Sequence, residues 1–396
     1  MRVSWVQPED LLSHELVAAR DLGKDVSKVT WRWLDAGGSL GPSATGAPAS
    51  PELHALADRL LEALDDQPMP AQPGEPDDFA GIQALWRTVP RWKPRFDADR
   101  VRAAWIGRAA GCFLGRAGGS GGDWPPKEPS ACDDLTYTVL ALRLVERCGS
   151  GFTTEDVARA WLDELPAGQI FTAERIAYRN LLLGYSPPQT ALRTNPFREW
   201  IGAQIRADLY GWIHPGRPDL AAACAYRDAI VSHVRAGVYG ALWVAAMSSA
   251  ALTASTVDEV LDAGEAVVPP VSRFANAVMD GRDLAGREKD WDGVVEAIHA
   301  RYGQRHWVHV LPNAALVAAA LAFHGGDFTA AVRGIVAAGC DTDSNGATVG
   351  AITAALAGGV PAEWSEPVGD TLHTSILGCD RVAFAELAER TVRVSK

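Results

Sequence analysis

The sequence predicts an all-α protein with a compact multi-helix domain. Alanine, leucine and valine recur at three- and four-residue spacing through most of the chain after residue 100, which is the spacing of helices that bury one or more faces. No segment shows sustained two-residue alternation bounded by hairpin turns, so we expect no β-sheet.

The first 95 residues differ in composition from the rest. Apolar residues at helical spacing predict helices at 7–21 and 51–64, and stretches rich in Gly and Pro follow each of them, at 36–43 and 68–76. Such stretches are typical of loops and linkers. We therefore expect an N-terminal helical arm with Pro/Gly-rich linkers over residues 1–95 and a globular domain over residues 96–396.

The helices expected in the domain have interiors of small apolar residues, which allow helix axes to approach closely. Several begin with a residue that caps helices well, such as Thr154 before Glu155 and Asp327 before Phe328. The expected helices are 101–114, 135–147, 154–165, 218–251, 257–267, 291–301, 313–324, 328–338, 347–357 and 383–392.

Composition limits the partners. Apolar residues make up 47% of the 396 residues and charged residues 22%, enough to form a sizeable core. The formal net charge of −12 and the absence of a basic run argue against nucleic acid as a partner. The most apolar stretch, 236–252, contains Gly and Ser and falls short of a membrane span, so we expect no membrane partner.

A cytoplasmic location is expected for two reasons. The chain begins without an apolar segment of the kind found in signal peptides. Its six cysteines show no CxxC spacing and mostly lie in apolar runs, as reduced, buried thiols do. The oligomeric state is not predicted.

The candidate functional residues of the chain are concentrated in two acidic clusters. Asp133 and Asp134 follow Cys132, and Asp341, Thr342, Asp343 and Ser344 lie about two hundred residues further on. Each cluster stands before an apolar helix. Acidic residues there either cap the helix or bind a hard cation, and for the Asp133–Asp134 pair taken alone capping is the favoured interpretation.

The second cluster also matches the opening of a calcium-binding EF-hand loop. That loop requires a bidentate acid at its twelfth position. The twelfth position here is Ile352, within a run of Ala, Val and Ile, so the EF-hand interpretation is rejected.

Together the clusters supply four carboxylates and a hydroxyl. Four carboxylates meeting in a helical core require cations, and two Mg²⁺ ions, with Mn²⁺ as an alternative, suit oxygen ligands. Zinc is disfavoured because no His accompanies either cluster.

With its other motifs, the chain resembles the ADP-ribosylglycohydrolase family, which includes the dinitrogenase-reductase-activating glycohydrolases and the ADP-ribosyl hydrolases. GRAAGCFLG at 107–115 is similar to the family's opening helix and glycine turn. The two acidic clusters are similar to its metal motifs. SHVRAGVYG at 232–240 and NGATVG at 345–350 resemble segments of an actinobacterial-type branch. The resemblance covers about 100–360.

The resemblance implies an all-α fold with a binuclear Mg²⁺ centre in a central cleft, which binds a ribose and positions a water molecule. It makes Asp133, Asp134, Asp341, Asp343 and Ser344 the metal ligands. The residues that take a direct part in catalysis would be Asp133, Asp134 and Asp343. For contacts to substrate it points to His233, Asn345, Gly118 and Gly119.

The chain departs from the family pattern in two places. Cys132 stands where members commonly have Thr or Asp, and a thiol is a poor ligand for Mg²⁺. The glycine turn at 116–122 carries no carboxylate, although members tend to have one there, and Asp123 or Glu128 is the candidate to replace it. Trp124 and Trp212 are expected in loops, where either could stack on a base.

Three functions follow as hypotheses. The first is a Mg²⁺-dependent hydrolase that cleaves a ribosyl bond in ADP-ribosylated protein or an ADP-ribose derivative. The second, suggested by the altered glycine turn, is an N-ribosyl hydrolase of a nucleoside-like small metabolite. The third is a noncatalytic protein that binds an ADP-ribose-like ligand.

Overall fold

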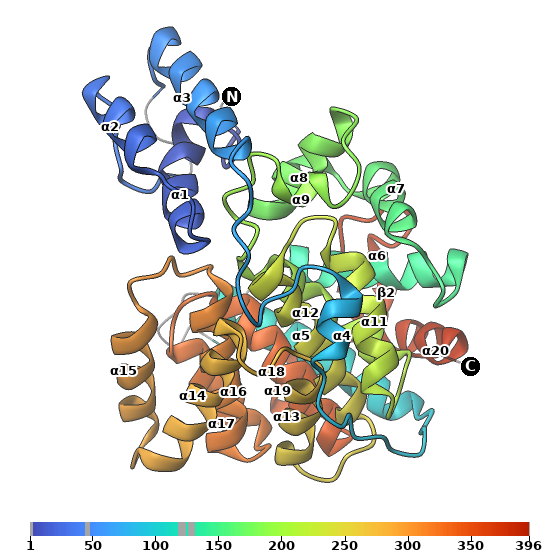
Figure 1. Cartoon of the computed structure of the whole chain (residues 1–396). Coiled ribbons are helices and arrows are strands. Elements are labelled where there is room, and N and C mark those ends of the chain that lie inside the picture. The colour runs from blue at the N-terminus through green and yellow to red at the C-terminus, as the bar shows by residue number, and fades with distance from the viewer. Residues whose placement is uncertain (1–2, 44–47, 118–123, 126–130, 396) are drawn as a thin grey trace.

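The protein is almost entirely helical (Figure 1). The computed structural model describes residues 3–43, 48–117, 124–125 and 131–395. Its α-helices are α1 (Pro8–Asp21), α2 (Ser27–Asp35), α3 (Pro51–Asp65), α4 (Phe79–Ala84), α5 (Ala98–Arg116), α6 (Asp133–Cys148), α7 (Thr154–Glu164), α8 (Thr172–Leu182), α9 (Gln189–Leu192), α10 (Asp208–Trp212), α11 (Pro218–Ala229), α12 (Arg235–Ala251), α13 (Val257–Ala266), α14 (Arg273–Arg287), α15 (Trp291–Tyr302), α16 (Val310–His324), α17 (Phe328–Ala337), α18 (Thr342–Ala357), α19 (Ala362–Val368) and α20 (Phe384–Val394). Two short 3₁₀ helices are η1 (Ala167–Gln169) and η2 (Ile201–Arg206). The predicted all-α class is confirmed.

One small β-hairpin corrects the expectation that the chain has no sheet. Strands β1 (Thr371–His373) and β2 (Arg381–Ala383) pair antiparallel near the C-terminus. Each strand has only three residues, and so short a strand cannot show the alternation on which the prediction relied.

The long helix expected at 218–251 is two helices. The chain breaks between α11 and α12, and Arg235, the first residue of α12, has a φ of 41°. Both halves carry the same apolar spacing, so periodicity alone could not reveal the break. The break matters because it places Ser232 and His233 beside the site described below.

Helices α5 and α18 pack along a seam of glycines. A Cβ on Gly346 would stand 2.5 Å from the carbonyl oxygen of Gly111, which is closer than Cβ atoms stand in real structures. Gly107 and Gly350 face each other in the same way one turn further along. Because both residues of each pair lack a side chain, the two backbones touch. The seam fixes the start of α18 against the end of α5.

Helices α1, α2 and α3 form a group at one end of the molecule (Figure 1). Their apolar side chains, such as Leu12 and Leu61, share one buried cluster with Phe197 and Trp200 of the domain. The two expected arm helices are confirmed as α1 and α3, and α2 was not predicted. The division of the chain at residue 95 stays a prediction.

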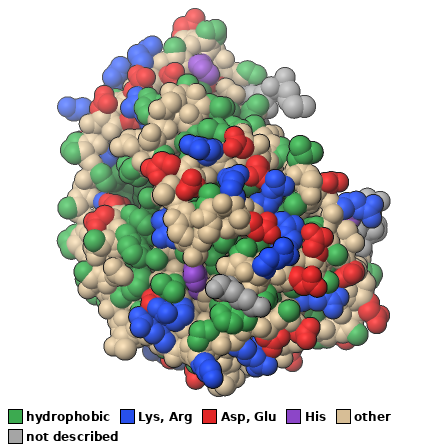
Figure 2. Space-filling view, turned by 90° about the vertical axis from the view of Figure 1, so that its right-hand side faces the viewer, with side chains coloured by type: hydrophobic (Ala, Val, Ile, Leu, Met, Phe, Trp, Pro, Cys, Tyr) green, Lys and Arg blue, Asp and Glu red, His purple; other side chains and the backbone are tan. Residues whose placement is uncertain are grey.

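The surface in Figure 2 carries acidic and basic side chains interspersed, without a continuous basic stripe on this face. Within the described residues, none of the helices combines the length and the hydropathy needed to cross a bilayer.

Candidate active site

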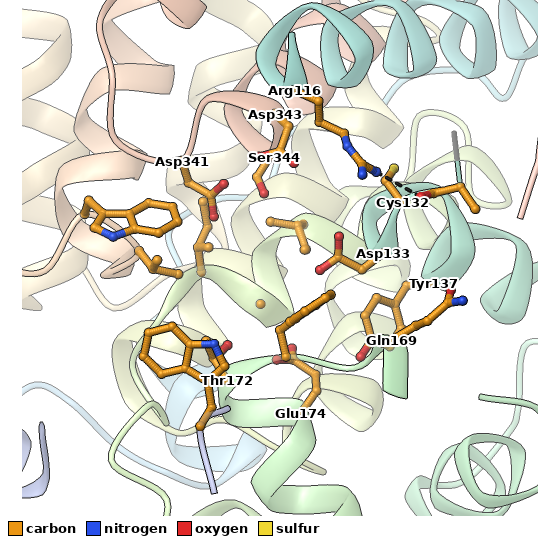
Figure 3. Close-up of a pocket in the computed structure, with 18 residues that line it drawn as sticks. Arg116, Cys132, Asp133, Tyr137, Gln169, Thr172, Glu174, Asp341, Asp343 and Ser344 are labelled. Carbon is orange, nitrogen blue, oxygen red and sulfur yellow. Dashed lines mark hydrogen bonds between the residues drawn. The ribbon is translucent and has the colours of Figure 1, made fainter. Parts of the chain in front are cut away.

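The two acidic clusters meet at one cavity (Figure 3). Its volume is about 410 Å³, within the range of small-molecule sites. The lining residues combine carboxylates, a few polar groups and aromatic rings: Trp5, Arg116, Ala131, Cys132, Asp133, Tyr137, Gln169, Phe171, Thr172, Glu174, Ile201, Gly202, Ile205, Trp307, Val308, Asp341, Asp343 and Ser344.

We call Asp133, Asp341, Asp343 and Ser344 the acidic floor of the cavity. Asp133 lies in the first turn of α6, and Asp343 and Ser344 lie in the first turn of α18. Asp341 occupies the N-cap position of α18, yet its side chain makes no capping hydrogen bond. The carboxylate of Asp341 is therefore not used as a helix cap and is directed into the cavity.

Buried contacts fix the start of α18 at this place. The hydroxyl of Thr342 donates to the carbonyl oxygen of Gly115 at 3.0 Å, at the end of the glycine seam. The backbone N–H of Asp341 donates to Oδ1 of Asn313 at 3.0 Å, and the side-chain amide of Asn345 donates to the same oxygen at 2.7 Å. Neighbouring residues thus hold Asp341 and Asp343 in position.

The acidic floor is electrostatically strained. Burial, followed by repulsion from Asp343, raises the pKa of Asp133 to about 6. The same two causes raise the pKa of Asp341 well above its usual value. Carboxylates that lose solvation and face each other favour the neutral form unless a cation neutralises them.

Asp134 lies behind the floor and is fully buried. Its pKa is raised well above the usual value, first by burial and then by Asp133 and Asp343. Arg108 lies 3.7 Å from Oδ1 of Asp134 but makes its 2.8 Å contact with Asp208 instead. Oδ1 of Asp134 accepts no hydrogen bond from the described residues, although Arg108 lies close enough for an ion pair.

Two thiols border the floor. The sulfur atoms of Cys112 and Cys132 lie 3.0 Å apart, and Cys112 donates to Oδ2 of Asp134 at 3.8 Å. The neighbouring thiol, and then burial, raise the pKa of Cys112 well above its usual value, so this thiol stays protonated. Within the described residues, the ligand atoms of Cys112, Cys132 and Asp134 lie within 4.8 Å of one another and form a group that could hold a metal.

The donor atoms of the floor suit a hard divalent cation. Asp133, Asp341 and Asp343 offer carboxylate oxygens, and Ser344 offers a hydroxyl, which are the ligands of Mg²⁺ or Mn²⁺. The raised pKa values of Asp133 and Asp341 are those of buried carboxylates that repel one another, and a bound cation would relieve that repulsion. The residues present therefore fit a hard metal centre.

Glu174, in the first turn of α8, lines the cavity across from the floor (Figure 3). Its Oε1 accepts a hydrogen bond from Arg206, which also binds Asp228 and Ser232. Burial raises the pKa of Glu174 to about 7 although Arg206 acts to lower it. This carboxyl group is thus held rigidly and can carry a proton near neutral pH.

Aromatic rings form the remaining wall. Trp5, Phe171 and Trp307 line the cavity, and 53% of the Trp307 side chain is exposed. The loop prediction for Trp212 was wrong, because Trp212 lies in α10, is 1% exposed and packs on Trp105. Trp124 packs on Trp364 at 4.6 Å between ring centroids.

A model of the ADP-ribosylglycohydrolase family matches residues 93–395. The chain belongs to the ADP-ribosylglycohydrolase family. It is thus a hydrolase of the glycosidase type, in a family that acts on ADP-ribose-related substrates and is in general metal-dependent.

Other comparisons add less to this family assignment. Among solved structures, the chain is similar to one described as an ADP-ribosylglycohydrolase-related protein complex, with a TM-score of 0.47 and 20% identity over 76% of this chain and 99% of that one. No curated protein matches.

The structure of this ADP-ribosylglycohydrolase brings some predicted site residues together and separates others. Asp133, Asp341, Asp343 and Ser344 share the cavity. His233 and Asn345 are buried and are not among the residues that line it. His233 stands behind Glu174, with 3.9 Å between its Nδ1 and Oε1 of Glu174.

Contact of His233 or Asn345 with substrate stays a prediction. Gly118 and Gly119 lie outside the described residues, as do Asp123 and Glu128.

Sequence reasoning missed several residues that line the site of this glycohydrolase. Glu174 and Trp5 are far from both acidic clusters in the chain, and neither belongs to a recognisable motif. The sequence only weakly indicates a site role for Arg116 and Tyr137. Arg116 directly follows the motif at 107–115, and Tyr137 lies four residues after Asp133. Long-range packing, which a single sequence does not display, brings Glu174 and Trp5 to the cavity.

Proposed function

We propose that this enzyme is a Mg²⁺-dependent hydrolase that cleaves a ribosyl glycosidic bond, with ADP-ribosylated protein or an ADP-ribose derivative as substrate. The observation that carries the proposal is the acidic floor, where oxygen ligands from the starts of two helices line one cavity. Under the proposal, Asp133, Asp134, Asp341, Asp343 and Ser344 hold two cations.

When bound, the cations would offset the charge of the floor, orient ribose hydroxyls and make a water molecule more acidic. The protein's own groups hold the sugar and exclude bulk water. Tyr137, whose buried hydroxyl has no partner among the described residues, and Gln169 both line the cavity and supply polar groups to the substrate.

We assign proton transfer to two carboxyl groups on opposite sides of the cavity, Glu174 and Asp133. Water adds to the anomeric carbon, the glycosidic C–N or C–O bond breaks, and its electron pair stays with the leaving atom. Glu174, protonated near neutral pH, donates a proton to that leaving atom. Asp133 on the floor accepts the proton that the water loses. Asp134 and Asp343 act with Asp133 by fixing the charge around the reacting carbon.

The second candidate, an N-ribosyl hydrolase of a nucleoside-like metabolite, is favoured by the shape of the cavity. A volume of about 410 Å³ with rings of Trp5, Phe171 and Trp307 around it suits a small aromatic substrate. The chemistry at the anomeric carbon is the same in both candidates, and only the leaving group differs.

The test compares release of ribosyl products from an ADP-ribosylated peptide and from free nucleosides, with and without EDTA. We expect EDTA to abolish turnover and Mg²⁺ to restore it. Asp341→Ala and Asp343→Ala should each remove at least one bound metal, as measured by elemental analysis. The control is Asp163→Ala on the exposed side of α7, which should change neither quantity.

Full activity in a metal-free preparation would overturn the proposal. Tight binding of ADP-ribose without turnover of any ribosyl substrate would instead support the noncatalytic hypothesis.

A further inference from the structure

The wall of the active site includes a residue from the N-terminal arm. Trp5 lines the same cavity as Asp133 and Asp341, although it precedes α1 and lies outside residues 93–395, which match the family. The family domain alone therefore does not complete this cavity.

The indole of Trp5 is held by a ring of aromatic side chains. Its ring centroid lies 5.4 Å from that of Phe197 and 5.8 Å from that of Trp200, both in edge-on geometry. His14 of α1 and His306 of the domain lie at 5.8 and 6.3 Å. Edge-on aromatic contacts of this kind fix both the position and the tilt of a ring.

The backbone at this place is fixed as well. Arg175 donates from Nη1 to the carbonyl oxygen and to the hydroxyl of Ser4, both at 2.7 Å. Trp5 itself has a φ of 62°, a conformation that costs a bulky residue free energy and persists only where neighbours impose it. Arg175 follows Glu174 in α8, so one turn of helix both holds the arm and supplies a carboxyl group to the cavity.

The walls of the cavity differ in chemistry. The floor presents carboxylates and a hydroxyl, while Trp5, Trp307 and Phe171 present aromatic rings. A ligand that binds both the acidic floor and the aromatic rings has a polar sugar at one end and a planar aromatic group at the other. A ribosylated heterocycle has this composition.

We propose that the N-terminal arm is part of the active site, and that Trp5 and Trp307 hold the planar heterocycle of the substrate while the floor holds its ribose. This inference rests on the proposed function, because it takes the acidic floor as the sugar site. It adds that recognition of the heterocycle depends on a segment outside the family domain.

The test is calorimetric binding of two probes to the full chain in the presence of Mg²⁺. ADP-ribose carries the heterocycle, and ribose 5-phosphate lacks it. For Trp5→Ala and for Trp307→Ala we expect the Kd of ADP-ribose to rise about 10-fold or more and that of ribose 5-phosphate to stay unchanged. Trp5→Phe should retain most of the affinity, while Trp5→Leu, which has no aromatic face, should not.

Two controls separate recognition from folding. Trp31→Ala removes an indole of α2 that is 74% exposed and should leave both affinities unchanged. Trp307 is half exposed, so its replacement should disturb packing little. Trp307→Ala therefore tests the aromatic contact to the heterocycle even if Trp5→Ala weakens docking of the arm. Thermal unfolding of each variant shows whether the fold is kept.

Equal loss of both probes in the tryptophan variants, or no loss of ADP-ribose, would overturn the inference and leave the proposed function standing. If the wild-type protein binds neither probe, the sugar site and the inference both fail. Asp341→Asn separates the sugar site at the floor from the heterocycle site at the tryptophans, since it should weaken the binding of both probes alike.

Discussion

The carboxylate of Glu15 in α1 accepts two hydrogen bonds from the guanidinium of Arg198, at 2.7 and 2.9 Å. Both side chains are almost fully buried. This bidentate pair joins the arm to the domain next to the aromatic cluster around Trp5. A buried pair of this geometry fixes orientation as well as proximity.

The first prediction concerns this pair. Glu15→Gln removes the hydrogen-bonded counter-charge of the buried Arg198 and leaves only the more distant Glu199 and Asp65, so we expect a loss of about 3 kcal/mol in the free energy of unfolding. Chemical denaturation measures it. Glu389→Gln, at an exposed position of α20, is the matched control. The double change Glu15→Met with Arg198→Met should recover most of the stability, and failure to recover would show that the charges themselves are required.

The second prediction concerns Cys132 beside the floor. Cys132→Thr places a hydroxyl oxygen where a thiol now stands, and we expect the Kd for Mg²⁺ to fall about 10-fold. Calorimetric titration with Mg²⁺ measures it. Cys148→Thr, at the far end of the same helix, should have no effect. Unchanged Mg²⁺ affinity together with weaker Cd²⁺ binding would show that the sulfur is itself a ligand.

The third prediction follows from Glu174. Its raised pKa of about 7 keeps the carboxyl group protonated below neutral pH. Since the proposed role requires the proton, kcat should fall about tenfold per pH unit as pH rises above 7. Glu174→Gln should lower kcat by about 100-fold or more and remove this alkaline limb. Persistence of the limb in that variant would assign it to another group.

The fourth prediction tests the glycine seam. Gly111→Ala places a methyl group against the backbone of Gly346, so α18 must move. We expect a loss of about 2 kcal/mol or more in stability and weaker Mg²⁺ binding, because Asp343 moves with the helix. The new methyl group of Gly286→Ala in α14 would meet no atom of the described residues within 4 Å, so this change should instead stabilise the protein by about 0.5–1 kcal/mol. Equal effects of the two changes would contradict the packing argument.

Local pattern was enough to predict much of the fold. The helices that became α5, α6, α16 and α18 have apolar residues at helical spacing on strongly buried faces, and their sequences show it directly. Helix α14 was missed because its fifteen residues include two glycines and two aspartates, which weaken helix propensity. Gly281 is needed there, since a Cβ would meet the carbonyl oxygen of Ala315. Tertiary packing, not propensity, makes this segment helical.

The site residues likewise divide into those that the sequence predicts and those that only the folded structure brings together. Asp133 and Asp341 could be found because each lies in a short acidic motif before a helix. Whether they cap their helices or bind a cation depends on where the carboxylates point, and only the shared cavity reveals that. Glu174 looks like an ordinary acidic residue in a helical first turn. Burial raises the pKa of Glu174 against the opposing charge of Arg206, and the local sequence encodes neither the burial nor the contact with Arg206.

The buried cluster beneath the arm has a consequence for synthesis of the chain. It joins residues of α1 and α3 to segments as far along as Val308. A ribosome adds about 5–20 residues per second, so the first three helices emerge on the order of tens of seconds before their last partner does. During that interval leucines such as Leu60 and Leu61 have no complete surface to cover them. The nascent arm is therefore the segment on which we expect chaperones to act.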